Sequence, residues 1–331
     1  MERFALAAAV VLGFALTAAL CSLFVPLRRV LERREQQQQP IQSEQPRPAP
    51  LRAPLWGGLC AAAGTVAAVG VGWLAACVGQ PELLGSEGRL MTRLLTALAG
   101  SLAFGAVGLA EDLARMRSPA ALGLRRDVRL LLEALAAAFV LLLLRAAGCL
   151  PRGLGVPGAG YVLLGSAVPF LWAVLMVTLA ECARIAERDE GTVCGAAFAA
   201  MLALMMVEAG LGVSGLAVLP GALAGALVAL GLWAFPPAKL GAGCCGSLLA
   251  AGAIGCIPLS LDMTSLTVPL ALPFWAAGGL WAAQLLCAKR TGKPLRCWVK
   301  KHKMSPETVF LCSFALSAVG YVLALALLRW C

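Results

Sequence analysis

Residues 92–147 read TRLLTALAGSLAFGAVGLA-EDLARMRSPAALGLRRD-VRLLLEALAAAFVLLLLRAA, two apolar runs on either side of a charged loop. At about 1.5 Å per residue, each run is long enough to cross roughly 30 Å of hydrocarbon as an α-helix. The loop between them, residues 111–127, is rich in arginine. Such a loop between two apolar segments is typical of the cytoplasmic side of a polytopic membrane protein.

The same alternation of apolar and polar segments continues along the whole chain. The chain is 60% hydrophobic and only 13% charged, whereas soluble domains carry about 25% charged residues. We therefore predict an all-α integral membrane protein with about ten transmembrane helices in one bundle, forming a single domain over residues 1–331. The predicted spans are 4–26, 55–78, 92–110, 128–147, 160–180, 192–208, 214–235, 244–261, 266–287 and 308–330.

The basic residues indicate how this bundle is oriented. Of 27 Lys and Arg residues, 20 fall in alternate loops, whereas the intervening loops hold only Arg89 and Arg152. The positive-inside rule places the basic loops in the cytoplasm and both termini outside, in a multi-pass protein of the cell membrane. These five loops, which we expect to form the functional site, are 27–54, 111–127, 181–191, 236–243 and 288–307.

The loop at 27–54 is rich in Gln, Pro and Arg. We expect Val30 to Gln38 to extend the first helix into water and the remainder to be flexible. The first apolar run is too long for a secretory signal and reads as a retained helix.

Several other functions are disfavoured by the sequence. The basic loops lack the interleaved aromatic residues of a nucleic-acid surface, so no nucleic-acid partner is expected. The 13 cysteines lie mostly in apolar segments and form no CxxC pair, which argues against a disulfide framework. A transporter is less favoured, because no internal repeat is evident and few charges lie near mid-membrane.

Carboxylates gather at two predicted helix ends. Glu111 and Asp112 end the third span, and Glu181, Glu187 and Glu190 follow the fifth. Neighbouring carboxylates at a helix end can bind a divalent metal or share a proton. The alternative is that they are solvated boundary residues balanced by neighbouring arginines.

The segment from Val107 to Leu135 resembles a segment of the polyprenyl-phosphate phosphoglycosyltransferases. This is glycosyltransferase family 4, the superfamily of phospho-N-acetylmuramoyl-pentapeptide transferase, in which an Asp-Asp pair precedes a basic stretch and a Gly-Leu turn. Four further loops resemble the family's motifs in the right order, so the resemblance covers residues 38–325. They are PLWGGL (54–59), ECARIAERDEGT (181–192), PAKLGAGCCGS (237–247) and TGKPLRCWVKKHKMSPE (291–307).

The resemblance implies transfer of a sugar-1-phosphate from a UDP-sugar to a membrane polyprenyl phosphate, with release of UMP and use of Mg²⁺. It implies catalytic roles for Glu111, Asp112 and His302. Metal binding would fall to Asp112, Glu187 and Glu190. The residues implied to contact substrate are Lys239, Glu181, Arg184, Lys300, Lys301 and Lys303.

One position departs from the family pattern in a way that bears on catalysis. Cys244 stands where the family has a metal-binding aspartate, and a thiol is a soft ligand poorly matched to Mg²⁺. Two readings therefore stay open: an active transferase, and a catalytically impaired relative that acts as a membrane scaffold or binds polyprenyl phosphate. A second copy of the chain and an intact paralogue are further partners left open.

Overall fold

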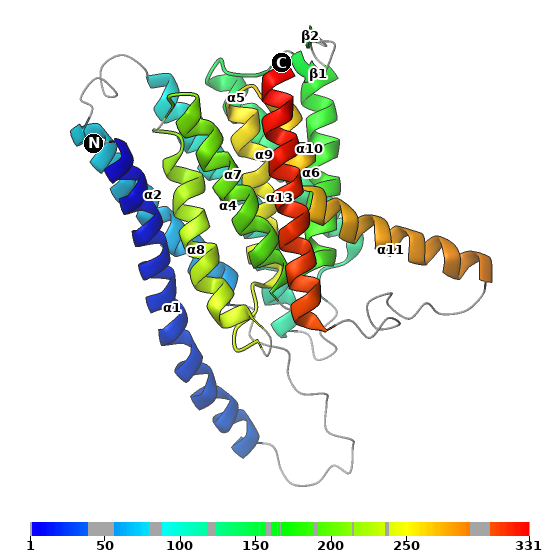
Figure 1. The fold of residues 1–331 in the computed structure, drawn as a ribbon. Coiled ribbons are helices and arrows are strands. Elements are labelled where there is room, and N and C mark those ends of the chain that lie inside the picture. The colour runs from blue at the N-terminus through cyan, green and yellow to red at the C-terminus, as the bar shows by residue number, and fades with distance from the viewer. Residues whose placement is uncertain are drawn as a thin grey trace.

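The protein is described from a computed structural model, in which a bundle of helices makes up nearly the whole fold (Figure 1). The structure describes residues 2–38, 56–79, 88–117, 123–151, 153–156, 160–163, 165, 167–187, 191–213, 215–235, 238–291 and 305–330.

Each of the ten apolar segments expected from the sequence contains helix, although the boundaries differ. The helices are α1 (Glu2–Gln38), α2 (Gly57–Gly79), α4 (Gly88–Arg117), α5 (Arg126–Ala146), α6 (Ala167–Ala186), α7 (Thr192–Gly210), α8 (Val218–Ala234), α9 (Gly243–Ser260), α10 (Thr267–Leu270), α11 (Leu272–Thr291) and α13 (Pro306–Trp330). As expected, α1 continues to Gln38, and in Figure 1 its last turns extend beyond the bundle.

The structure supports an integral membrane protein, but it does not confirm ten crossings. Among the described residues, seven helices are long and apolar enough to span a membrane, or eight if the bent pair formed by α10 and α11 is one span. The helix α8 is shorter, with 17 residues. The helix α5 carries Arg129, Glu133 and Arg145 within its apolar stretch, and such charges are costly in hydrocarbon.

Two predicted spans need correction. The segment 160–180 is not helical from its start, because residues Gly160–Leu163 form strand β2, which pairs antiparallel with β1 (Gly153–Val156). The segment 266–287 is broken, with a bend of 63° between its two parts. Glycine and proline are frequent in both regions, and neither residue favours an unbroken helix.

The helix α9 lies in the middle of the bundle, and all of its residues are buried. It packs against α2, α4, α6 and α7. Small residues allow these contacts to be close: a Cβ atom added at Gly108 of α4 would lie 2.2 Å from the Cys244 carbonyl oxygen, and one added at Gly58 of α2 would lie 2.1 Å from the Gly246 nitrogen. Backbone contact of this kind is how helices associate in lipid.

Both described ends of the chain, in α1 and α13, lie at one end of the bundle in Figure 1. The last turns of α4 and α6 meet the first turn of α9 at the opposite end, as hydrogen bonds between them show. This opposite end carries most of the charged side chains described below. Figure 1 also shows α11 projecting from the side of the bundle.

Candidate active site

Two carboxylates from other helices cap the first turn of α9. Asp112 accepts hydrogen bonds from the backbone N–H groups of Cys244 (3.0 Å, to Oδ1) and Cys245 (2.9 Å, to Oδ2). Glu187 Oε1 accepts from the N–H of Gly243 at 2.7 Å. The first N–H groups of a helix have no acceptor within it and form its positive end, so carboxylates stabilise that end.

The packing of α4 on α9 explains how Asp112 reaches these groups. Gly108 lies one helical turn before Asp112 and lets the two backbones touch at Cys244. Gly243 has a φ of +68°, which a glycine adopts without strain and which directs the chain into the first turn of α9. As a result Asp112 is only 1% exposed and still has its charge satisfied.

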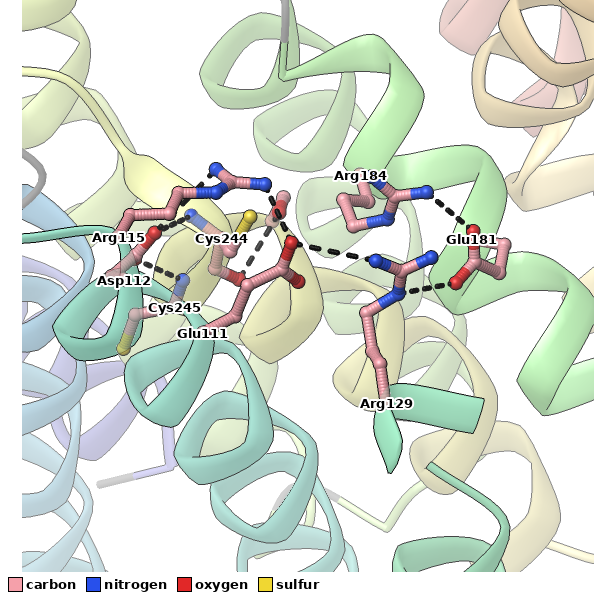
Figure 2. Close-up of polar contacts among 9 residues, drawn as sticks. Glu111, Asp112, Arg115, Arg129, Glu181, Arg184, Cys244 and Cys245 are labelled. Carbon is pink, nitrogen blue, oxygen red and sulfur yellow. Dashed lines mark hydrogen bonds and ion pairs between the residues drawn. The ribbon is translucent and has the colours of Figure 1, made fainter. Parts of the chain in front are cut away.

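A chain of alternating charges connects α4, α5 and α6 beside this capped turn (Figure 2). Arg115 Nη2 lies 2.6 Å from Glu111 Oε1, and Arg129 Nη1 lies 3.6 Å from the same oxygen. Arg129 Nε donates to Glu181 Oε1 at 2.7 Å, and Arg184 Nη2 donates to Glu181 Oε2 at 2.6 Å. Arg129 of α5 therefore bridges the carboxylates of α4 and α6.

Solvent exposure differs among the side chains of this cluster. Glu111 is 2% exposed, whereas the side chains of Arg115 and Glu181 are 25% and 24% exposed. This exposure gives solvent contact to a cation and an anion at the rim, while the carboxylates beneath are desolvated. Burial raises the pKa of Glu187 to about 8, and the N–H of Gly243 and the charge of Arg115 oppose that shift.

Among the described residues, the structure brings together the predicted site residues apart from Lys239. Glu111 and Asp112 lie with Cys244 at one junction. Arg129 connects Glu111 to Glu181, which in turn pairs with Arg184. Glu111 and Asp112 are buried rather than solvated, but Arg115 balances both, as the alternative to a functional pair expects.

Other predicted residues lie at the margin or outside the described chain. Lys239 is exposed in the turn before α9, and its backbone N–H donates to the Trp233 carbonyl. The predicted site residues that lie outside the described residues are Glu190, Lys300, Lys301, His302 and Lys303.

The expected Mg²⁺ does not fit the described donors as they are arranged. Mg²⁺ prefers free oxygen ligands in near-octahedral geometry, but both oxygens of Asp112 accept backbone hydrogen bonds, and so does Oε1 of Glu187. Cys244 supplies a buried thiol in place of a carboxylate. Within the described ranges, no three His, Cys, Asp or Glu side chains form a group that can hold a metal.

Sequence reasoning gave no site role to Arg129 or Glu133, which lie four residues apart on α5. Both are buried, at 7% and 0% exposure. The signal was present, since charged residues inside an apolar segment are rare and mark functional or paired positions. Their spacing of four also places them on one face of the helix.

The apolar helices and the buried ionic cluster at one end of the bundle define the class of this protein. It is an integral membrane protein with a polar site at the ends of its helices. Residues 94–262, which carry all the described cluster residues, match glycosyl transferase family 4, and the chain belongs to this family. This membership indicates transfer of a phospho-sugar to a lipid carrier. A comparison with curated proteins found no match.

Proposed function

We propose that the protein transfers a sugar-1-phosphate from a UDP-sugar to a polyprenyl phosphate, in the synthesis of lipid-linked precursors of cell-envelope glycans. The observation that carries this proposal is the ionic cluster of Glu111, Arg129 and Glu181 within the family-matched region, at the end of the bundle where α9 begins. A lipid-borne phosphate and a water-soluble nucleotide meet at such a boundary.

The reaction requires little covalent chemistry from the protein. An oxygen of the lipid phosphate forms a bond to the sugar-bearing β-phosphorus, the bond from that phosphorus to the bridging oxygen breaks, and UMP leaves with that oxygen. Catalysis of such a displacement depends on positioning and on cations near the developing charge. Arg115 and Arg184 are partly exposed at the rim, and the exposed Lys239 adds a charge beside α9. These cations are the groups that we assign to the phosphates.

Glu111 and Glu181 set the geometry of those arginines. Each carboxylate holds a guanidinium at 2.6 Å, and Arg129 joins the two carboxylates from beneath. A guanidinium held in this way presents its remaining N–H groups in a fixed direction, which suits recognition of phosphate oxygens. We therefore assign to Glu111 and Glu181 the orientation of the cations that contact phosphate.

A second candidate function is a non-catalytic binder of polyprenyl phosphate. The specific observation that favours it is the engagement of Asp112 by α9 together with Cys244 at the family's metal position. Those features remove carboxylates from metal binding but leave the arginines in place. In this reading the protein recognises the lipid phosphate without transfer.

Release of UMP separates the two functions. The purified full chain is incubated in nanodiscs with polyprenyl phosphate, Mg²⁺ or Mn²⁺ and a panel of UDP-sugars. Transfer predicts UMP in excess of that from an Arg129→Met variant, which removes the bridge between the two carboxylates. Gly70→Ala is the matched control, because a Cβ atom there meets open space. Binding of polyprenyl phosphate without UMP from any donor would leave only the second function.

The residue at position 244 provides a second test of the same question. In Cys244→Asp, a further carboxylate is placed beside Glu111 and Asp112, and mutual repulsion should lower the thermal midpoint in metal-free buffer. Added Mn²⁺ should restore the midpoint and raise UMP release if the cysteine limits transfer. An unchanged rate in the variant would show that the limit lies elsewhere.

A further inference from the structure

Glu133 is the most deeply buried charged side chain of the cluster, at 0% exposure, one helical turn beyond Arg129 on α5. Neither of its carboxylate oxygens has a hydrogen-bond partner among the described residues. A buried carboxyl group without partners is costly, and nearly all buried polar groups in proteins are paired. Glu133 therefore requires a partner other than the side chains of the described residues.

Two other buried atoms of the same cluster also have no hydrogen-bond partner among the described residues. They are Glu111 Oε2 on α4 and Arg184 Nε on α6, and both helices pack against α5. The charged groups that act on Glu133 are Glu181 and Arg184 from α6, Glu111 from α4, and Arg129 from its own helix. Glu133 therefore lies within electrostatic range of the two other groups that carry an unpaired atom, on helices that pack against its own.

The chemistry of these atoms identifies what fits between them. The partner must donate to carboxylate oxygens and also accept from a guanidinium N–H. Water does both, and buried waters commonly make about three hydrogen bonds to groups that lack other partners. A metal cation cannot accept the hydrogen bond of Arg184 Nε and is repelled by its charge.

We propose that an ordered water molecule binds between α4, α5 and α6, hydrogen bonded to Glu111 Oε2, Glu133 and Arg184 Nε, and that Glu133 acts through it as a positioning residue. The water ties Arg184 and Glu111 to α5, from which Arg129 already reaches both carboxylates. Glu133 then fixes the separation of the α4 and α6 charges that face the phosphates. The effect on phosphates rests on the proposed function, whereas the water site does not.

Two substitutions at Glu133 test the positioning role, with matched substitutions at a second buried carboxyl group. Glu133→Gln keeps the shape and can hydrogen bond to water, whereas Glu133→Leu cannot. Glu208 of α7 is also buried, and one of its carboxyl oxygens has no hydrogen-bond partner in the described part of the chain. No charged side chain of that part acts on it. Glu208→Gln and Glu208→Leu therefore report the cost of altering a buried carboxyl group outside the cluster.

Three quantities are measured for each variant in nanodiscs: affinity for polyprenyl phosphate, kcat and KM for UMP release, and the thermal midpoint. Glu133→Leu should weaken lipid-phosphate binding or lower kcat/KM by at least about tenfold, equivalent to about 1.4 kcal/mol. Glu133→Gln should stay within about twofold of the parent in affinity and in kcat/KM, equivalent to about 0.4 kcal/mol. The Glu208 variants should change the thermal midpoint alone.

The proposal is overturned if Glu133→Leu matches the parent in affinity and turnover while losing no more thermal stability than Glu208→Leu. A parent that binds polyprenyl phosphate but releases no UMP would refute transfer, and the affinity of Glu133→Leu would still decide the positioning role. An experimental structure that resolves ordered waters decides the site itself. Density between Glu133 and Arg184 supports it, and a direct ion pair between these side chains refutes it.

Discussion

Asp112 has both of its carboxylate oxygens bound to the backbone of α9, although sequence reasoning assigned it to metal and catalysis. A buried carboxylate that accepts two N–H groups at a helix start stabilises that helix directly. The structural role and the expected catalytic role therefore compete for the same two oxygens. Substitutions at this position will change stability as well as activity.

We predict that Asp112→Ala lowers the free energy of unfolding by about 1–3 kcal/mol for each N–H group left without an acceptor. Asp112→Asn keeps one acceptor oxygen and should lose less. Thermal unfolding in detergent, followed by tryptophan fluorescence, should rank the parent as most stable, then Asp112→Asn, then Asp112→Ala. An Ala variant as stable as the parent would mean that Asp112 does not cap α9.

The raised pKa of Glu187 predicts how the stability of the protein changes with pH. Its pKa is raised from 4.5 to about 8 by burial, so between these pH values the folded protein holds a proton that the unfolded chain has released. Stability should therefore fall as the pH rises through that window. Glu187→Gln lacks this proton and should gain thermal midpoint relative to the parent as the pH increases. A constant difference between the two proteins across the window would contradict this assignment.

At the scale of the helices, the site depends on how closely α2 and α4 approach α9. The glycines at the contacts leave no room for a Cβ atom. Backbone contact, rather than interlocking side chains, therefore fixes how far α2 and α4 lie from α9. The carboxylates of α4 and α6 and the N–H groups of α9 then meet within hydrogen-bond distance. The close packing of these helices therefore also determines the geometry of the site.

Two glycines on α2 give a matched pair of variants. A Cβ atom at Gly58 would lie 2.1 Å from the Gly246 nitrogen, whereas one at Gly70 meets nothing within 4 Å. Gly58→Ala should destabilise the bundle by about 1–3 kcal/mol through overpacking. Gly70→Ala should be neutral or stabilising by up to about 1 kcal/mol, because alanine favours helix. Thermal unfolding measures both, and equal effects at the two positions would refute the close contact.

The sequence predicted these elements better than it predicted their contacts. The order of motifs placed Glu111, Asp112, Glu181 and Cys244 at one end of the bundle. There Asp112 binds the backbone of Cys244, and Arg129 connects Glu111 to Glu181. Spacing alone does not show whether a carboxylate binds metal or caps a helix, because both uses need a carboxylate oxygen near a positive charge. Arg129 was missed because its segment was read as apolar.

At the scale of the whole molecule, the alternation of basic loops predicts a topology that can be tested by labelling. Lys239 is exposed beside the start of α9, and Leu163 is 75% exposed in the hairpin. A membrane-impermeant maleimide should label Lys239→Cys only after the cytoplasmic side is opened. It should label Leu163→Cys in intact cells. The parent, whose Cys287 and Cys312 are exposed, sets the background, and labelling of both variants in intact cells would refute this topology.

Hydropathy predicted where the chain is helical more reliably than how often it crosses the membrane. Helices occur in all ten apolar segments, but the hairpin at 153–163 replaces the start of one span and a 63° bend divides another. An apolar glycine-containing stretch can form strand as readily as helix, and average hydropathy does not distinguish them. The number of crossings thus depends on local backbone geometry.

The capping of α9 also sets an order of events during synthesis of the chain. Asp112 is made 132 residues before Cys244, and Glu187 is made 56 residues before Gly243. Until α9 enters the membrane, both carboxylates sit at the ends of inserted helices without the N–H groups that will satisfy them. A nascent or truncated chain that stops before Gly243 therefore lacks the backbone donors that Asp112 and Glu187 bind in the complete fold. Arrival of α9 is the step that supplies these hydrogen bonds and completes the core.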